Sequence, residues 1–232
     1  MPIDYRLVSG PRIIEAVDNG YLPVIPTGSL EQHCNGPVGV DGLIAERIAW
    51  ESCKMLEDNE GIKCVVLPTI YYGFSPEWSG TPGTITLTMN TYKGMIHDIL
   101  DSLVQQGFRK IAVINGHGGN SLVLEAIIRE WLAKTDNVAI ALIDYWKTVE
   151  VEIGHASMSE QEVAEHLGIK AEFTECQKEA IITKKYKILT KPPKATIGAR
   201  IEIQRGELVG VIEGVYKALV ELIKHKQGIY IL

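Results

Sequence analysis

Two groups of side chains suited to binding a metal lie far apart in the sequence, each directly after a short apolar run. Glu31, His33 and Asp41 follow the first run, and His117 follows the second within the turn 115–120 (NGHGGN). Carboxylates and imidazoles are common ligands of zinc, manganese and iron. If both apolar runs are strands of one sheet, the two groups can form a metal site, and such a site would favour a hydrolase over a binding module.

The spacing of these residues favours a site with two metal ions. Glu31 and His33 are separated by one residue, so in an extended or turning segment each can face a different ion. Asp41 lies at the expected start of a helix, where its carboxylate can bridge two cations or simply cap the helix. The glycines around His117 leave room beside its imidazole, and Asn120 can cap the helix that follows. Each residue taken singly is more often structural, but four at one edge of a sheet predict a metal centre.

Alternating strands and helices must position these side chains. Apolar runs predict strands at 21–26, 63–67, 110–114 and 138–143, and a further short strand at 84–88. Periodic apolar residues predict helices at 41–56, 90–106, 120–134, 159–167 and 206–226. Residues 70–83 are expected to form a long loop, and 171–205 a hairpin or a long connection. This alternation predicts an α/β fold, three-layered and doubly wound, with a mostly parallel sheet and helices on both faces.

The expected sheet also predicts where a ligand binds. In open α/β sheets the site lies beyond the carboxyl ends of the strands. Three polar segments follow expected strands in this way, at 27–41, 70–83 and 115–120. Because topology and side-chain chemistry indicate the same edge of the sheet, we expect an active site there.

The composition argues against several classes of protein. The chain has 232 residues, which fits one domain spanning 1–232. The net charge of −6 argues against nucleic acid as the main partner. No CxxC pair occurs among the four cysteines, no signal peptide is recognised, and no apolar run approaches the ~20 residues of a membrane span. We therefore expect a cytoplasmic protein with no nucleic-acid or membrane partner.

Four blocks of the sequence resemble signature blocks of the creatininase family. They are 28–33 (GSLEQH) with Asp41, 81–85 (TPGTI), 115–120 (NGHGGN), and His155-Ala156 with Glu160. Their order and spacing match over roughly residues 20–165, which makes a chance match improbable. The resemblance implies a creatininase-like α/β fold, a metal-dependent amidohydrolase activity, and a homo-oligomer, commonly a hexamer.

The resemblance also implies which residues bind two divalent metals. Glu31, Asp41 and His117 resemble the ligands of one metal, and His33 and Asp41 resemble ligands of the second, with Asp41 bridging. Creatininase carries a Glu two residues after the His of the Gly-His turn, where this chain has a glycine. We therefore expect a later acidic residue, Glu160, to complete the ligands of the second metal.

Further roles come from the same resemblance. His155 resembles the catalytic His of the family, and Glu160 is expected to hold the attacking water beside it. The side chains and backbone expected to line the substrate pocket are Trp78, Gly118, Gly119 and Asn120. Many family members have a His where this chain has Trp78, and this difference argues against creatinine as the substrate.

The predicted function is hydrolysis of a C–N bond in a small cyclic or linear amide, with water activated by two zinc, manganese or iron ions. One alternative within the family is deformylation of a formylaminopyrimidine nucleotide in flavin and deazaflavin biosynthesis, with Arg200 or Lys147 contacting the phosphate. An alternative from another class is a non-catalytic α/β module that binds a nucleotide through the loop 116–119.

Overall fold

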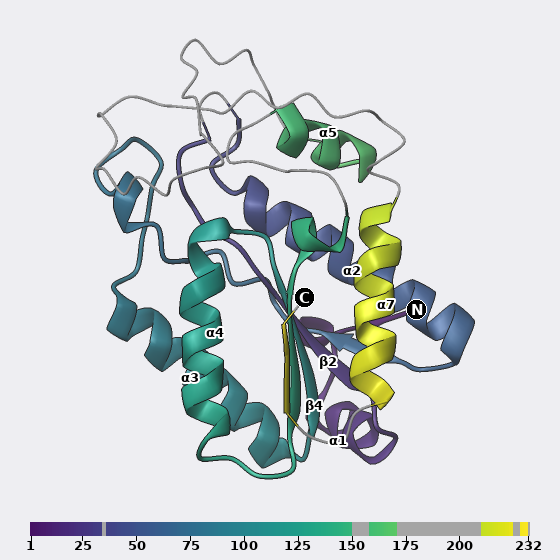
Figure 1. The fold of residues 1–232 in the computed structure, drawn as a ribbon. Helices are drawn as coiled ribbons and strands as arrows, with labels where there is room; N and C mark the ends of the chain where they lie inside the picture. The colour runs from purple at the N-terminus through teal and green to yellow at the C-terminus, as the bar shows by residue number, and fades with distance from the viewer. Residues whose placement is uncertain (34–35, 150–157, 171–209, 225–227, 232) are drawn as a thin grey trace.

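A six-stranded parallel sheet forms the centre of the protein (Figure 1). The computed structural model describes residues 1–33, 36–149, 158–170, 210–224 and 228–231. The strands are ordered β1-β3-β2-β4-β5-β6, and every pair of neighbours runs parallel. Their bounds are β1 Ile3–Asp4, β2 Leu22–Thr27, β3 Cys64–Val66, β4 Lys110–Asn115, β5 Ala139–Asp144 and β6 Gly228–Ile231.

Helices cover both faces of this sheet. Figure 1 shows α3 (Met89–Gln106) and α4 (Gly118–Leu132) on one side, and α2 (Val40–Glu60) and α7 (Gly210–Lys224) on the other. The remaining α-helices are α1 (Gly10–Asp18) and α5 (Met158–His166), and short 3-10 helices occupy η1 (Tyr5–Leu7), η2 (Pro76–Trp78) and η3 (Tyr145–Thr148). The predicted three-layer α/β fold is confirmed. No helix among these residues has the length and apolar character needed to span a membrane.

Two hydrophobic cores follow from the alternation of side chains along the central strands. Val24 of β2 and Ala112 of β4 point to the core beneath α2 and α7, whereas Ile25 and Val113 point to the core beneath α1, α3 and α4. All six residues of β2 and of β5 are buried, as expected for strands covered on both faces. The continuous apolar runs in the sequence are therefore the signature of a central parallel sheet.

The secondary structure agrees with most of the sequence predictions. The four long apolar runs are strands, the five predicted helices are present within a few residues of their expected bounds, and Gly107 ends α3 with a left-handed backbone (φ 111°). The predicted strand at 84–88 is wrong, because its backbone pairs with loops: Ile85 bonds Leu30 and Leu87 bonds Gly73. Helix α4 begins at Gly118, with His117 as N-cap, so Asn120 does not cap it. The connection expected at 171–205 lies outside the described residues.

The order of the strands reverses direction between β2 and β4. From β2 the chain passes through α2 to β3 on one side, and then through α3 to β4 on the other side of β2. The connections that leave β2 and β4 therefore diverge to opposite faces of the sheet. Such a point of divergence is where open α/β sheets bind their ligands.

Candidate metal centre

The loops that follow β2 and β4 bring the two predicted groups of side chains together at this edge of the sheet. Thr27 and Asn115, the last residues of the two strands, are paired in the sheet. Side chains a few residues beyond each therefore start from adjacent points. Glu31, His33 and His117 are all buried there.

Five buried side chains form two overlapping groups with the spacing of metal ligands. The first ligand group is Glu31, Asp41 and His117, and the second ligand group is His33, Asp41 and Glu160. Within each group the ligand atoms lie within 4.8 Å of one another. Asp41 belongs to both. The sequence-based pairing of Glu31 with one group and His33 with the other is thus the arrangement found in the structure.

Asp41 offers one carboxylate oxygen to each group. Its Oδ1 lies 3.0 Å from Nε2 of His33, and its Oδ2 lies 3.1 Å from Nδ1 of His117. The hydroxyl of Ser29 donates a hydrogen bond of 2.7 Å to the same Oδ2. Asp41 lies in the first turn of α2, whose N-cap is Gly39. The alternative that Asp41 is only a helix cap is therefore wrong.

Both imidazoles are held at the nitrogen that faces away from Asp41. Nδ1 of His33 donates to the backbone oxygen of Glu31 at 3.0 Å. Nε2 of His117 lies 3.1 Å from Oγ of Ser75 and 3.3 Å from the backbone oxygen of Phe74. Each ring therefore presents its remaining nitrogen to the carboxylates.

The carboxylates change the proton affinity of both rings. Burial alone lowers the pKa of His33, but the negative charges of Asp41 and Glu160 outweigh it and raise the pKa to about 10. Burial also lowers the pKa of His117, and the charge of Glu31 together with the hydrogen bond to Asp41 raises it to about 9. Burial favours a higher pKa for Asp41, yet the two imidazoles hold it well below its ordinary value. The carboxylates of the centre thus stabilise positive charge beside them.

Asparagine side chains fix the turn that carries His117. Asn115 accepts a hydrogen bond from the backbone N–H of His117 and donates to its carbonyl oxygen, at 3.1 and 2.9 Å. Asn120 joins two other loops, because its Nδ2 donates to the oxygen of Gly28 and its Oδ1 accepts from the N–H of Phe74, both at 2.9 Å. These bonds connect the three polar segments that the sequence placed at the carboxyl edge of the sheet.

Two glycines allow the ligand loops to approach closely. A Cβ atom at Gly28 would lie 2.3 Å from the backbone nitrogen of Gly42, and one at Gly116 would lie 2.1 Å from the backbone oxygen of Asp41. Backbone atoms cannot move aside as a flexible side chain can. A glycine is therefore required at both positions to bring His117 within reach of Asp41.

Glu160 lies beside His33 and Asp41, where a further acidic ligand was expected. It is buried in the first turn of α5, and its Oε2 lies 3.8 Å from Nε2 of His33. A side chain at Gly119 would not fit, because its Cβ would lie 2.3 Å from Nε2 of His117. The structure therefore brings Glu160 into the second ligand group and leaves position 119 without space for a ligand.

The predicted substrate-pocket residues differ in how exposed they are. Gly118 is exposed, with open space where a side chain would begin, and Trp78 is half-buried in η2. The amide of Asn120 is engaged by backbone groups. Their contact with substrate stays a prediction, and His155 lies outside the described residues.

Sequence reasoning missed the two buried serines of the centre. Ser29 bonds Asp41, and Ser75 bonds His117. Ser29 stands inside the 28–33 block, so its proximity to Glu31 was a usable signal. Ser75 lies within the long loop 70–83, and no local pattern connects it with His117, which is 42 residues away.

The two alternative functions, the nucleotide deformylase and the non-catalytic nucleotide-binding module, find little support in this geometry. Lys147, offered as a phosphate contact, is paired at 2.8 Å with the buried carboxylate of Asp144. Arg200 lies outside the described residues. The loop 116–119 borders the carboxylates of Glu31 and Asp41, whose negative charge disfavours a phosphate group there.

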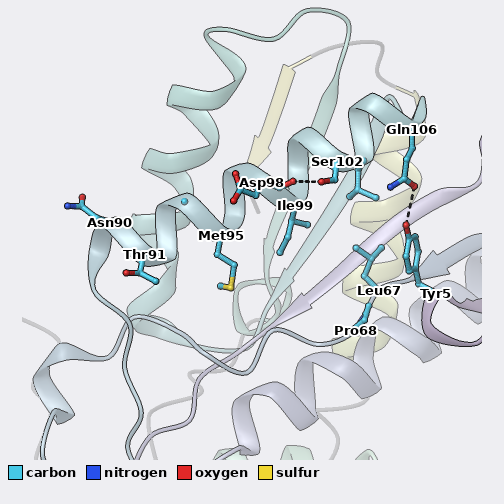
Figure 2. A pocket seen from close by; sticks show the side chains of 12 residues that line it. Tyr5, Leu67, Pro68, Asn90, Thr91, Met95, Asp98, Ile99, Ser102 and Gln106 are labelled. Atoms are coloured by element: carbon cyan, nitrogen blue, oxygen red, sulfur yellow. Dashed lines mark hydrogen bonds between the residues drawn. The ribbon is translucent and has the colours of Figure 1, made fainter.

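A groove of about 690 Å³ lies away from the metal centre, between α3 and the segment around Leu67 (Figure 2). Its lining is mostly apolar, and Asp98 is its only charged residue. A hydrogen bond from Tyr5 to Gln106 closes one end. This groove has no group of ligands or acid–base residues, so it is not a candidate for hydrolytic chemistry.

The donors of the ligand groups fit divalent transition metals. They combine carboxylate oxygens with imidazole nitrogens, a mixture that suits zinc, manganese or iron(II). All five side chains are buried, and each imidazole has a hydrogen-bond acceptor on its outer nitrogen, as metal-bound histidines commonly do. Glu31, Asp41 and His117 would hold one cation, and His33, Asp41 and Glu160 the other.

Known proteins resemble this chain in sequence. Residues 8–173 match the creatininase family, described as creatinine amidohydrolase. The creatinine amidohydrolase of Pseudomonas putida is 31% identical over 138 residues, covering 55% of this chain and 51% of that protein. The 3-dehydro-scyllo-inosose hydrolase of Thermotoga maritima is 28% identical over 125 residues, covering 53% of this chain and 38% of that protein. The matches thus span about half or less of these curated relatives.

Solved structures resemble the chain over nearly its full length. A Bacteroides fragilis protein assigned provisionally as a creatinine amidohydrolase superposes with a TM-score of 0.80 at 22% identity, over 97% of this chain and 98% of that one. Two creatininase structures, a variant of the Zn–Zn type and a manganese form, both superpose with a TM-score of 0.74, at 19% and 17% identity. They cover 95% and 97% of this chain and 98% of their own. At these identities the likeness establishes the fold.

Proposed function

Since this chain belongs to the creatininase family, we propose that it is a metal-dependent amidohydrolase that opens a C–N bond in a small cyclic or linear amide. The observation that carries the proposal is the sharing of Asp41 between two buried ligand groups. One carboxylate with an oxygen facing each group is the arrangement that two adjacent cations need. The proposal treats 1–232 as a single catalytic domain.

Each residue of the site has a separate proposed role. When bound, two divalent cations supply an acidified water molecule and a Lewis acid for the carbonyl oxygen. Asp41 holds the two ligand groups in register, and Glu31 and Glu160 add negative charge on either side of it. Glu160 is also our candidate for the group that orients the attacking water. His155 is the proposed donor of a proton to the leaving nitrogen.

The name of the Pseudomonas relative, creatinine amidohydrolase, supports a small amide as substrate. The Pseudomonas relative acts on creatinine and the Thermotoga relative on an inosose, so substrates differ among similar proteins. We propose an uncharged amide, because the described part of the site offers no unpaired cation for an anionic group and Lys147 is already bonded to Asp144. Zinc, manganese and iron remain the proposed metals, and the proposed assembly is a homo-oligomer, of six chains by family resemblance.

Metal analysis with a substrate screen tests this function. Purified protein should contain one to two equivalents of a transition metal. Protein loaded with zinc, manganese or iron should hydrolyse at least one member of a panel of lactams, formamides and small cyclic ureas. Protein that binds none of these metals would contradict the proposal.

A single substitution tests whether Asp41 is the shared ligand. Asp41→Asn keeps the shape of the side chain and removes its charge, so it should abolish turnover and lower zinc affinity by more than about 100-fold, beyond the loss seen for outer partners of metal ligands. Asp58→Asn is the matched control, because Asp58 is an exposed carboxylate of the same helix. Full zinc content and turnover in Asp41→Asn would refute the scheme.

A further inference from the structure

His117 reaches its hydrogen-bond partners from both sides of its ring. Nδ1 lies 3.1 Å from Asp41 and 3.3 Å from Glu31, inside the first ligand group. Nε2 lies against the loop 70–83, 3.1 Å from Oγ of Ser75 and 3.3 Å from the carbonyl oxygen of Phe74. Which nitrogen carries the proton decides whether Nδ1 has a lone pair to offer.

The carbonyl of Phe74 sets the direction of these bonds. A carbonyl oxygen only accepts hydrogen bonds, so the bond to Phe74 requires a proton on Nε2 of His117. A hydroxyl can donate or accept. With Nε2 protonated, Oγ of Ser75 must be an acceptor, and Nδ1 is the nitrogen left to bind a metal.

We propose that Ser75 is a positioning residue: it holds His117 in the tautomer with the proton on Nε2, so that Nδ1 faces the cation of the first ligand group. This inference rests on the proposed function, since it assumes that a metal is bound there. No motif of the sequence assigns a role to Ser75. Its effect is exerted through His117.

The surroundings of Ser75 keep its hydroxyl in place. Ser75 is 1% exposed, and its backbone N–H donates to Oγ1 of Thr86 at 2.8 Å. The preceding residue, Phe74, is tied to Asn120 at 2.9 Å. These two hydrogen bonds anchor the loop at Phe74 and Ser75. The hydroxyl of Ser75 is therefore less mobile than that of a serine on the surface.

The second ligand group achieves the same result by another route. Nδ1 of His33 donates to the backbone oxygen of Glu31, two residues away. That partner cannot be removed by substitution, whereas the hydroxyl of Ser75 can. Histidines that bind metals commonly depend on such outer partners, whose loss costs about 10-fold to 100-fold in metal affinity.

The contacts Ser75–His117–Asp41 also have the connectivity of a serine-hydrolase triad. In a triad the serine hydroxyl donates its proton to the imidazole. Here the Phe74 carbonyl demands the opposite direction, and Nδ1 of His117 faces two carboxylates of a metal-ligand group rather than one. The geometry therefore favours Ser75 as an acceptor over Ser75 as a nucleophile.

Zinc affinity of three variants tests the inference. Ser75→Ala should bind zinc about 10-fold more weakly than wild type, at the lower end of the usual range because Phe74 remains as a second acceptor. Ser75→Thr keeps the hydroxyl and should restore affinity to within about 3-fold. Ser79→Ala, an exposed serine four residues away, is the control and should match wild type. Equal affinity of Ser75→Ala and wild type would overturn the proposal.

A nitrogen NMR experiment on zinc-loaded wild type reads the tautomer directly. We expect the His117 signals of a ring protonated on Nε2 and bound to zinc through Nδ1, and in Ser75→Ala a faster exchange of that proton with water. A proton on Nδ1, or covalent labelling of Ser75 by a fluorophosphonate, would refute the assigned direction. If wild type binds neither zinc, manganese nor iron, the proposed function fails as well; if it binds two equivalents of zinc and hydrolyses an amide with Ser75→Ala unchanged, only this inference fails.

Discussion

Zinc binding to this protein should release about two protons per chain at pH 7.5. The reason lies in the two imidazoles of the centre, since a metal binds only the neutral ring. The pKa of His33 is about 10 and that of His117 about 9. At pH 7.5 both rings are therefore protonated in roughly 97% of molecules or more, and each must lose its proton when a cation binds.

This proton release has a large effect on affinity. With two protons displaced, the product of the two zinc affinities rises by about 100-fold for each pH unit below about 8.5. Above about pH 11 both rings are mostly neutral, and the dependence should flatten. Histidines with an ordinary pKa of about 6.5 would instead release only about 0.2 protons in total at pH 7.5.

Isothermal titration calorimetry measures the number of protons. Zinc is titrated into metal-free protein in several buffers of the same pH that differ in ionisation enthalpy, and the slope of the observed heat against that enthalpy gives the protons released. Ionisation of solvent at the site can only add to the number. A release of fewer than one proton at pH 7.5 would therefore refute the argument that the carboxylates keep His33 and His117 charged.

Two further predictions concern stability and the fit of the loops. Gly119→Ala should lower zinc affinity about 10-fold and the free energy of unfolding by about 1–3 kcal/mol, because its Cβ would lie 2.3 Å from Nε2 of His117. Denaturant titration measures the loss of stability. In the same titration the control Gly118→Ala, whose Cβ would meet no atom within 4 Å, should change the free energy of unfolding by less than about 0.5 kcal/mol. Metal-free protein should lose stability as the pH rises from about 6.5 to about 10. The pKa values of His33 and His117 are raised in the folded protein, so their protonation stabilises the fold fully below the unfolded pKa of about 6.5. This contribution is lost as the pH rises through the folded pKa values of about 9 and about 10. Thermal unfolding at several pH values checks this, and a stability that rises across that window would contradict it.

The sequence predicted most of the fold because the central elements carry strong local signals. The buried strands β2, β4 and β5 are continuous apolar runs, and α3 is an amphipathic segment ended by a glycine. Elements with weak signals were missed: β1 has two residues and β6 has four, both at the edges of the sheet. The segment 84–88 has the composition of a strand, but its hydrogen bonds go to neighbouring loops, and a local pattern cannot reveal that.

By itself the sequence determined the identities of Glu31, His33, Asp41 and His117 and their places after buried strands, because residue types and periodicity are local properties. The shared place of Asp41 and the place of Glu160 in the second ligand group were expected only from the family resemblance, and the tertiary structure is what brings these side chains together. It also decided that Ser75 lies against His117. These contacts join residues far apart in the chain, and they depend on which strands are neighbours and on how closely their glycine-containing loops approach, which no local pattern of residues encodes.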